Sequence, residues 1–152
     1  MAKFIYKMQS VLNIKLKMEE QARMDFAAAR MHLDEEEEKL NGLIQRKEEY
    51  EEEGRELRTD ALKVLDILAN RQAIERMDAL ILLQRDAVEK ARHMLEEARE
   101  KLQTAMQESK THEKLKEHAF EEFMKELNAQ EAKEVDELTS YTYGKRTSEV
   151  HG

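Results

Sequence analysis

The sequence predicts an all-α protein: a long two-helix antiparallel coiled-coil hairpin followed by a short disordered C-terminal tail. Three observations predict this fold. The composition favours helices, since 39% of the 152 residues are charged and the chain has only 4 Gly and no Pro. Apolar residues recur at steps of three and four along two long stretches. The charges lie in blocks that complement one another only when the chain folds back on itself.

The first stretch predicts a helix over residues of about 3–57. Most of the residues that share one face of this helix are apolar, as expected for the seam of a coiled coil. These seam positions are Ile5, Met8, Leu12, Lys15, Glu19, Ala22, Phe26, Ala29, Leu33, Glu36, Leu40, Leu43, Lys47, Tyr50, Gly54 and Leu57.

The second stretch predicts a helix over residues of about 74–139. Its seam is more uniformly apolar as far as Ala105, and the apolar pattern then slips in phase before Phe120 and Phe123, as a stutter would. The positions before the slip are Ile74, Met77, Ile81, Gln84, Val88, Ala91, Leu95, Ala98, Leu102 and Ala105.

The turn of the hairpin is expected in region 58–73, between the two seams. Thr59 and Asp60 form a possible N-cap, and Asn70 is a plausible C-cap. The apolar pattern ends at Leu138, so we expect one hairpin domain over residues 1–140 and a flexible tail over 140–152.

The charge blocks favour an intramolecular hairpin over a parallel dimer. Residues 1–33 carry 6 basic and 3 acidic side chains, whereas residues 105–138 carry 5 basic and 10 acidic ones. Folding back near residue 65 lays the basic block along the acidic block, but a parallel dimer would oppose each block with its own copy. A larger oligomer is left open. The same folding places Phe4 and Tyr6 close to Phe123 and Leu127.

Composition argues against several classes of function. A net charge of -8 disfavours nucleic acid as the partner. No run of about 18 apolar residues occurs, so direct membrane insertion is not expected. The absence of Cys excludes disulfides and agrees with a cytoplasmic protein. Phosphate-binding glycine loops are also missing.

No catalytic residue, cofactor site or metal site is expected, and the chain is not expected to be an enzyme. A two-helix seam offers no cleft in which two carboxylates could acquire different pKa values. Glu89, His93 and Glu97 share a helical face, but in so charged a chain chance explains this grouping. No two histidines are spaced for zinc; they are His32, His93, His112, His118 and His151.

Some features could instead bind other proteins. The acidic runs 34–38 and 48–53 are either solvated helix faces or docking surfaces for a basic partner. Tyr50 lies between these runs, and its roles as a seam residue and as an anchor for a partner stay equally open. Methionines such as Met18 and Met24 fill the seam or form an adaptable binding face.

Two stretches, one at each end of the chain, carry distinctive residues in a fixed order. The first is Phe4-x-Tyr6-x-x-Gln9-x-Val11-Leu12-x-x-Lys15 followed by Glu19-Glu20-Gln21-Ala22. The second is Glu113-Lys114-Leu115-Lys116, leading through Phe120 to Glu131-x-Lys133-Glu134-x-Asp136-Glu137. Together they resemble the FliJ family of flagellar export proteins, and Tyr50, after Leu43-Ile44, sits where that family often has a tyrosine. The resemblance covers residues of about 1–140, although the aromatics that the family often carries near Arg46 and Ala73 are missing.

This resemblance implies a cytoplasmic component of the flagellar type III export apparatus, peripheral to the inner membrane at the flagellar base. Its partners would be the export ATPase hexamer and the cytoplasmic part of the export gate membrane protein, which it would connect as a stalk-like adaptor. It could also serve as an export chaperone or bind other export chaperones. The implied ATPase-facing residues at the open end are Phe4, Tyr6, Lys7, Gln9 and Phe123. The implied gate-facing residues near the turn are Leu43, Tyr50, Met77, Leu80 and Gln84.

Two alternatives share the hairpin or the seam. A generic scaffold coiled coil needs only the seam, and the block charges and the phase slip disfavour it. A stalk subunit of an injectisome or of a rotary ATPase would have the same shape and different partners, so the physics of the sequence does not separate it from the flagellar protein.

Overall fold

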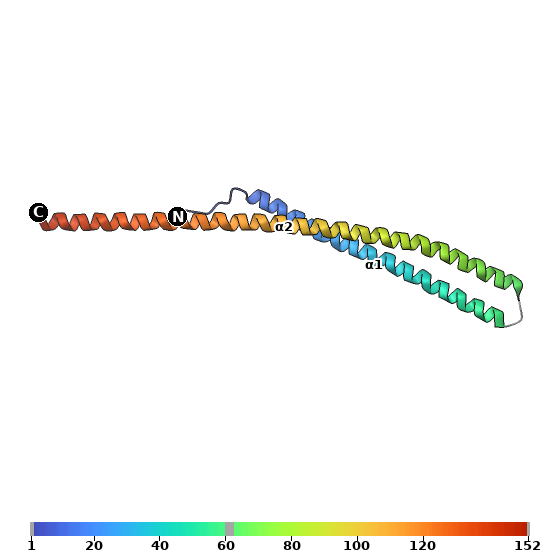
Figure 1. Cartoon of the computed structure of the whole chain (residues 1–152). Helices are drawn as coiled ribbons and strands as arrows, with labels where there is room; N and C mark the ends of the chain where they lie inside the picture. The colour runs from blue at the N-terminus through green and yellow to red at the C-terminus, as the bar shows by residue number, and fades with distance from the viewer. Residues whose placement is uncertain (1, 60–62, 152) are drawn as a thin grey trace. The chain divides into compact units, whose positions relative to one another are not determined.

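The computed structural model describes residues 2–59 and 63–151, with side chains as far as residue 146. It contains two helices, α1 (Gln9–Thr59, 51 residues) and α2 (Val64–His151, 88 residues), shown in Figure 1. The described residues contain no strand. The predicted fold class, all-α with two long antiparallel helices packed against each other, is confirmed.

The chain divides into two compact units, and each unit contains part of α1 and part of α2. Unit 1 comprises Met1–Met18 and Met106–Gly152, and unit 2 comprises Glu19–Ala105. The pairing is antiparallel within unit 2, because the later α1 residue Tyr50 bonds the early α2 residue Asn70, whereas the earlier Glu36 bonds Gln84.

The seam of unit 2 is the predicted one. Every position of the two predicted seams from Glu19 to Leu57 and from Ile74 to Ala105 is buried or half-buried. Side chains of Ala91 and Val88 are 0% and 3% exposed. Small residues at these positions allow the two helices to approach closely, and burial of this narrow stripe is the main force that holds them together.

The turn is shorter than the predicted region 58–73. α1 ends at Thr59, whose hydroxyl donates to the Glu56 carbonyl at 2.8 Å, and α2 begins at Val64, about ten residues earlier than expected. Residues 60–62, including the Asp60 of the predicted cap, lie outside the described residues. The second helix starts early because half-buried Ile67 and Asn70 continue the seam spacing toward the turn.

Asn70 is therefore not a C-cap but an interior residue of α2. Its side-chain amide donates to the main-chain carbonyl of Tyr50 at 2.8 Å, across the seam. Gly54, on α1, lies directly against it: a Cβ at Gly54 would be 2.5 Å from Asn70 Oδ1. Glycine leaves room for this polar side chain between the helices, and a larger residue would displace it.

α1 begins at Gln9, six residues later than predicted. The amide of Gln9 donates to the Tyr6 carbonyl at 3.2 Å, and residues 2–6 are not helical. The first residues leave the helical path because Phe4 packs against α2, as described below. This packing is the physical reason why the expected helix from residue 3 is wrong.

The slip in phase predicted before Phe120 and Phe123 does not change which face of α2 is buried as far as Phe123. The positions Ser109, His112, Lys116, Ala119 and Phe123 continue the alternating steps of four and three from Ala105, and half-buried Leu127 follows Phe123 after a second consecutive step of four. The phase of the apolar residues slips, but the helix does not follow it. Polar side chains therefore occupy the seam, and Phe120 is 46% exposed.

The last part of α2 packs against no other described residue of the chain closely enough to be buried. Residues 128–146 are all exposed, and the helix continues to His151. Side chains of 147–152 lie outside the described residues, so the flexibility expected for residues 140–152 stays a prediction.

Candidate partner-binding sites

An aromatic cluster forms the first candidate site, in unit 1. The ring of Phe4 meets the ring of Phe120 edge-on, with centroids 5.2 Å apart and planes at 77°. It also meets Phe123 at 5.4 Å. The antiparallel pairing thus brings Phe4 to Phe123, as the sequence predicts. Tyr6 and Leu127 are half-buried, and Phe4 rather than Tyr6 makes the ring contact with Phe123.

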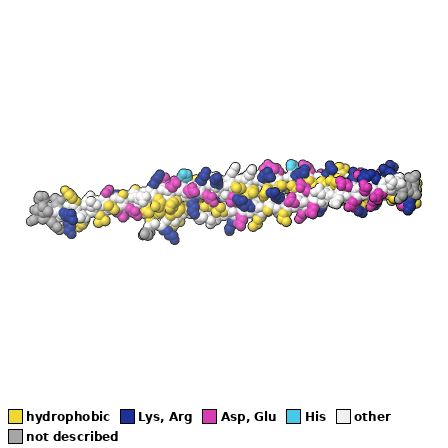
Figure 2. All heavy atoms as spheres, turned by 90° about the horizontal axis from the view of Figure 1, so that it is seen from below, with side chains coloured by type: hydrophobic (Ala, Val, Ile, Leu, Met, Phe, Trp, Pro, Cys, Tyr) yellow, Lys and Arg dark blue, Asp and Glu magenta, His cyan; other side chains and the backbone are white. Residues whose placement is uncertain are grey.

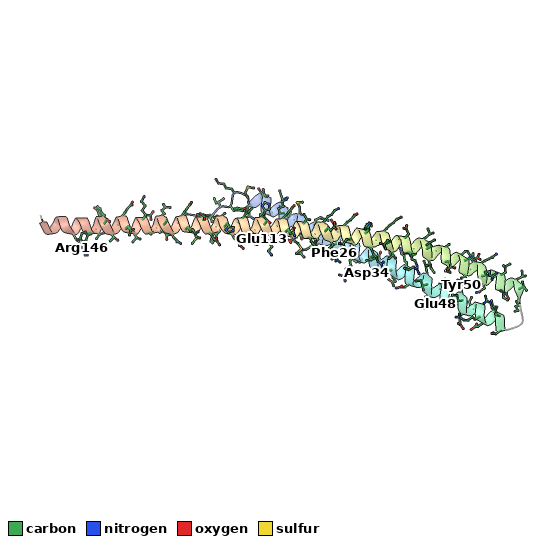
Figure 3. All side chains as sticks on the ribbon, viewed as in Figure 1. Phe26, Asp34, Glu48, Tyr50, Glu113 and Arg146 are labelled. Carbon is green, nitrogen blue, oxygen red and sulfur yellow. The ribbon has the colours of Figure 1, made fainter. Side chains whose placement is uncertain are left out.

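A groove of about 570 Å³ opens beside this cluster. Its apolar wall is made by Phe4, Leu12, Leu16 and Phe120, and Gln9, Glu113, Lys116 and Glu117 form the polar part. Figure 3 labels Glu113 on α2. Grooves with apolar walls and a polar rim are common docking sites for side chains of a partner. Sequence reasoning missed Leu16 because it lies beside the expected apolar stripe, and Lys116 because it is a charged residue at a seam position.

Exposed basic and apolar side chains lie in the same part of the chain as this groove. Residues 1–18 contain four lysines and no acidic residue. Lys3 and Lys7 are exposed, as are Ile5 and Met8, at 76% and 48%. We call the groove together with these exposed residues the N-terminal surface. Gln9, another expected contact, is half-buried and donates to Asn13 Oδ1 at 2.9 Å.

The seam between α1 and α2 in unit 1 contains several polar side chains. Lys15 Nζ lies 3.0 Å from Glu108 Oε2, across the two helices. Ser109 is only 3% exposed, and its hydroxyl donates to the Met106 carbonyl at 3.1 Å. His112 Nδ1 is buried and has no hydrogen-bond partner. Such a group costs free energy in the folded state, since water is lost and not replaced.

Gln84, one of the expected gate-facing residues, makes polar contacts across the seam in unit 2. Gln84 Nε2 donates to both the main-chain carbonyl of Glu36, at 2.9 Å, and its carboxylate, at 2.5 Å. This bond, with a further one from Lys39, lowers the pKa of the Glu36 carboxyl. Lys47 Nζ lies 2.6 Å from Asp78 Oδ1, a contact that raises the pKa of Lys47. Gln84 thus has a structural role in pairing the helices.

Tyr50 is a seam residue, the first of the two roles that its sequence context leaves open, and its role as an anchor for a partner stays a prediction. It is half-buried at a seam position of α1 (Figure 3). The guanidinium of Arg46 lies 4.5 Å from the centre of its ring and donates to its hydroxyl at 3.1 Å. Leu43 and Met77 are likewise half-buried. These three side chains belong mainly to the seam, with their outer edges open to solvent.

Three exposed leucines on α2 form the second candidate site, in unit 2. Leu80, Leu82 and Leu83 are 43%, 71% and 69% exposed, while Ile81 between them is buried at 8%. We call them the leucine patch. Exposed leucines this close together along a helix make this stretch of α2 a candidate interaction surface, because their contact with water is unfavourable. The search for a seam in the sequence missed Leu82 and Leu83, since it assigns them to the solvent side.

Half of the acidic side chains in the two acidic runs make ion pairs within the chain. Glu37 lies 3.6 Å from Arg92 of α2, and Glu36 lies 3.2 Å from Lys39. In the second run Glu49 pairs with Arg46 at 2.8 Å, and Figure 3 labels the neighbouring Glu48. Charged side chains of both signs cover the face seen in Figure 2, with hydrophobic ones between them. These contacts favour a solvated helix face over a docking surface for a basic partner.

Among the described side chains, those of residues 2–59 and 63–146, no group of three or more His, Asp or Glu is placed to hold a metal ion. Within the same residues, neither helix is long and apolar enough to cross a membrane.

Comparison with known proteins gives one family and one fold. The family model described as Flagellar FliJ protein matches residues 4–148. The solved structure of CT670 from Chlamydia trachomatis, a proposed YscO homolog, superposes with a TM-score of 0.63 at 23% identity, covering 96% of this chain and 99% of that one. Curated protein sequences give no match. The identity with CT670 is low, so that likeness shows the fold alone.

Proposed function

Because the chain belongs to the family of flagellar FliJ proteins, we propose that it is a stalk-like adaptor between the hexameric export ATPase and the cytoplasmic part of the export gate. Family membership makes it a coiled-coil protein of flagellar type III export, in a family of non-catalytic export components. The adaptor role, the two partners and a cytoplasmic position beside the inner membrane go further and are the content of the proposal.

The observation that supports an adaptor is the presence of two different surfaces, one in each unit. The N-terminal surface combines aromatic rings, an apolar groove and lysines. The leucine patch is purely apolar and lies on α2. The two surfaces differ in charge, because lysines accompany only the first, and surfaces that differ in this way suit two different partners.

We assign the ATPase to the N-terminal surface. The stretches that carry the family resemblance come together there, and the rings of Phe4, Phe120 and Phe123 are already in contact. Large rings in a preformed cluster are typical anchors of protein interfaces. The exposed Lys3 and Lys7 would guide an acidic partner surface toward the groove and speed its association.

We assign the gate to the leucine patch. Of the residues expected near the turn, Leu80 is exposed, whereas Gln84 is engaged in the seam. Leu82 and Leu83 extend the exposed apolar area around Leu80. These leucines are exposed to water in the free chain, so their burial by a partner would favour binding through the hydrophobic effect.

Binding of purified full-length variants to each partner tests both assignments. A double variant, Lys3→Glu with Lys7→Glu, should weaken binding to the export ATPase and its effect on ATP hydrolysis. A second, Leu82→Ser with Leu83→Ser, should weaken binding to the cytoplasmic part of the gate. The lysine variant is the control in the assay of gate binding, and the leucine variant is the control in the assay of ATPase binding. Both variants should leave the helical melting curve nearly unchanged, because all four side chains are exposed.

The two assignments stand or fall separately in this design. Loss of ATPase binding in the leucine variant, with retention in the lysine variant, would mean that the ATPase docks on unit 2. Retention of both partners by both variants would contradict the adaptor proposal.

A chaperone role is the second candidate function, and exposed methionines favour it. Met24 and Met31, seven residues apart on α1, are 58% and 64% exposed. Flexible thioether side chains adapt to differently shaped apolar partners. Oxidation of the methionines to sulfoxide should then abolish binding of an export substrate or of another export chaperone, whereas binding that survives oxidation would contradict this role.

A further inference from the structure

The exposed end of α2 carries an apolar stripe that nothing in the described part of the chain covers. Residues 128–146 are all exposed. On one helical face Val135, Leu138 and Tyr141 are 60%, 65% and 69% exposed. Beside Leu138 the surface is hollowed, in a depression of about 320 Å³ that Thr142 and Arg146 also line.

Propensity alone gives a helical segment of this kind little stability, because most helices in proteins are stabilised by packing of an apolar face. In the seam of unit 2 the same kind of stripe is covered by the opposite helix. The stripe at the end of α2 therefore calls for a partner from outside the single chain.

The charges along the stripe indicate which partner fits. At steps of three and four the face reads Leu127, Glu131, Glu134, Leu138, Tyr141 and Lys145. Acidic positions thus lie on the N-terminal side of the central pair, Leu138 and Tyr141, and a basic position lies on the C-terminal side. A second copy running in the opposite direction complements this order, since it places Lys145 against Glu134 at both ends of the pair.

We propose that two copies of the chain associate through the exposed end of α2 as an antiparallel pair. Leu138 of each copy packs against Tyr141 of the other, and Glu134 pairs with Lys145 of the other. A parallel pair would oppose Glu134 with Glu134 and Lys145 with Lys145, which is unfavourable. With few apolar layers the association is weak and reversible, so the same stripe can be released to another partner. This inference goes beyond the adaptor role and does not depend on it.

Charge exchange within the full-length chain tests the pairing. Sedimentation equilibrium should show a concentration-dependent dimer for the natural sequence. Glu134→Lys or Lys145→Glu alone should weaken dimerisation by about tenfold or more, because like charges then meet at two symmetric positions. The double variant, Glu134→Lys with Lys145→Glu, should restore it. The control is Lys133→Glu with Asp136→Lys, on the opposite face of the same turn, which should leave dimerisation unchanged.

The natural absence of Cys allows a second test that reads the orientation directly. A mixture of Glu134→Cys and Lys145→Cys chains should form a disulfide between the two variants on mild oxidation, and neither variant should cross-link with itself. Self-cross-linking of each variant would show a parallel pair. A chain that stays monomeric at its highest soluble concentration, with helicity retained, would overturn the proposal.

Discussion

The side-chain oxygen of Asn70 lies 2.5 Å from the place where a Cβ on Gly54 would be, while the amide of the same side chain donates to the Tyr50 carbonyl. This polar contact between the helices occupies the space that a side chain at Gly54 would need. Glycine in a helix costs about 1 kcal/mol relative to alanine. The bond made by Asn70 offsets part of that cost.

We therefore predict that Gly54→Ala fails to stabilise the chain unless Asn70 is also changed. In the Asn70→Ala background, Gly54→Ala should raise the free energy of unfolding by about 1 kcal/mol. In the natural background the gain should disappear, because the new methyl displaces the Asn70 side chain from its bond. Urea titrations followed by circular dichroism would give the four values of the cycle.

Gly42 provides the matched control for this cycle. A Cβ at Gly42 would meet nothing within 4 Å, so Gly42→Ala should stabilise the chain by about 1 kcal/mol in both backgrounds. Equal gains at Gly42 and Gly54 in the natural background would show that the contact with Asn70 is not restrictive.

Replacement of His112 should stabilise the hairpin. Its Nδ1 is buried without a hydrogen-bond partner, and a leucine would fill a similar volume without a polar atom. We expect His112→Leu to raise the free energy of unfolding by about 1 kcal/mol or more. The control is His118→Leu, whose side chain is 74% exposed and which should change stability little. Destabilisation by His112→Leu would show that the imidazole makes a contact that matters.

We predict that the hydrogen bond from Gln84 to Glu36 makes the stability of the folded chain depend on pH. It lowers the pKa of the Glu36 carboxyl from its ordinary value of 4.5, so the folded chain favours the ionised form more than the unfolded chain does. The resulting stabilisation is present above pH 4.5 and is lost as the pH falls through the lowered pKa. Melting temperatures of the natural chain and Glu36→Gln, measured from pH 7 to pH 3, should converge toward the acid end. A constant difference would contradict a contribution from this carboxylate.

The long seam could be predicted from the sequence because each turn of both helices needs a side chain that can be buried at the position facing the other helix. Leu33, Tyr50 and Ile81 were assigned to the seam from spacing alone, and each is buried or half-buried. The approach of Phe4 to Phe123 followed from antiparallel pairing. These features depend on the periodic spacing of apolar residues, and a single sequence repeats that spacing many times.

The features that escaped prediction depend on single contacts. The non-helical start of the chain follows from the packing of Phe4 on α2, and the early start of α2 follows from Asn70. The polar seam at Ser109 and His112 was missed because an apolar pattern can slip along a helix while the helix itself continues without interruption. The leucine patch was missed because a search for a seam assigns its residues to solvent.

The short connection between α1 and α2 leads to the last prediction, which compares two insertions of the same size. Two residues, Gly and Ser, inserted between Thr59 and Lys63 should cost less than about 1 kcal/mol, since loop-closure entropy grows slowly with length. The same two residues inserted after Asp34, within α1, would rotate the following part of the helix by about 200° and turn its apolar face away from α2. We expect the second variant to lose most of its cooperative melting transition and the first to retain it. If the insertion at the connection were as damaging as the one inside α1, the segment between the helices would have to be packed rather than a simple link, and the early start of α2 at Val64 would need a further cause.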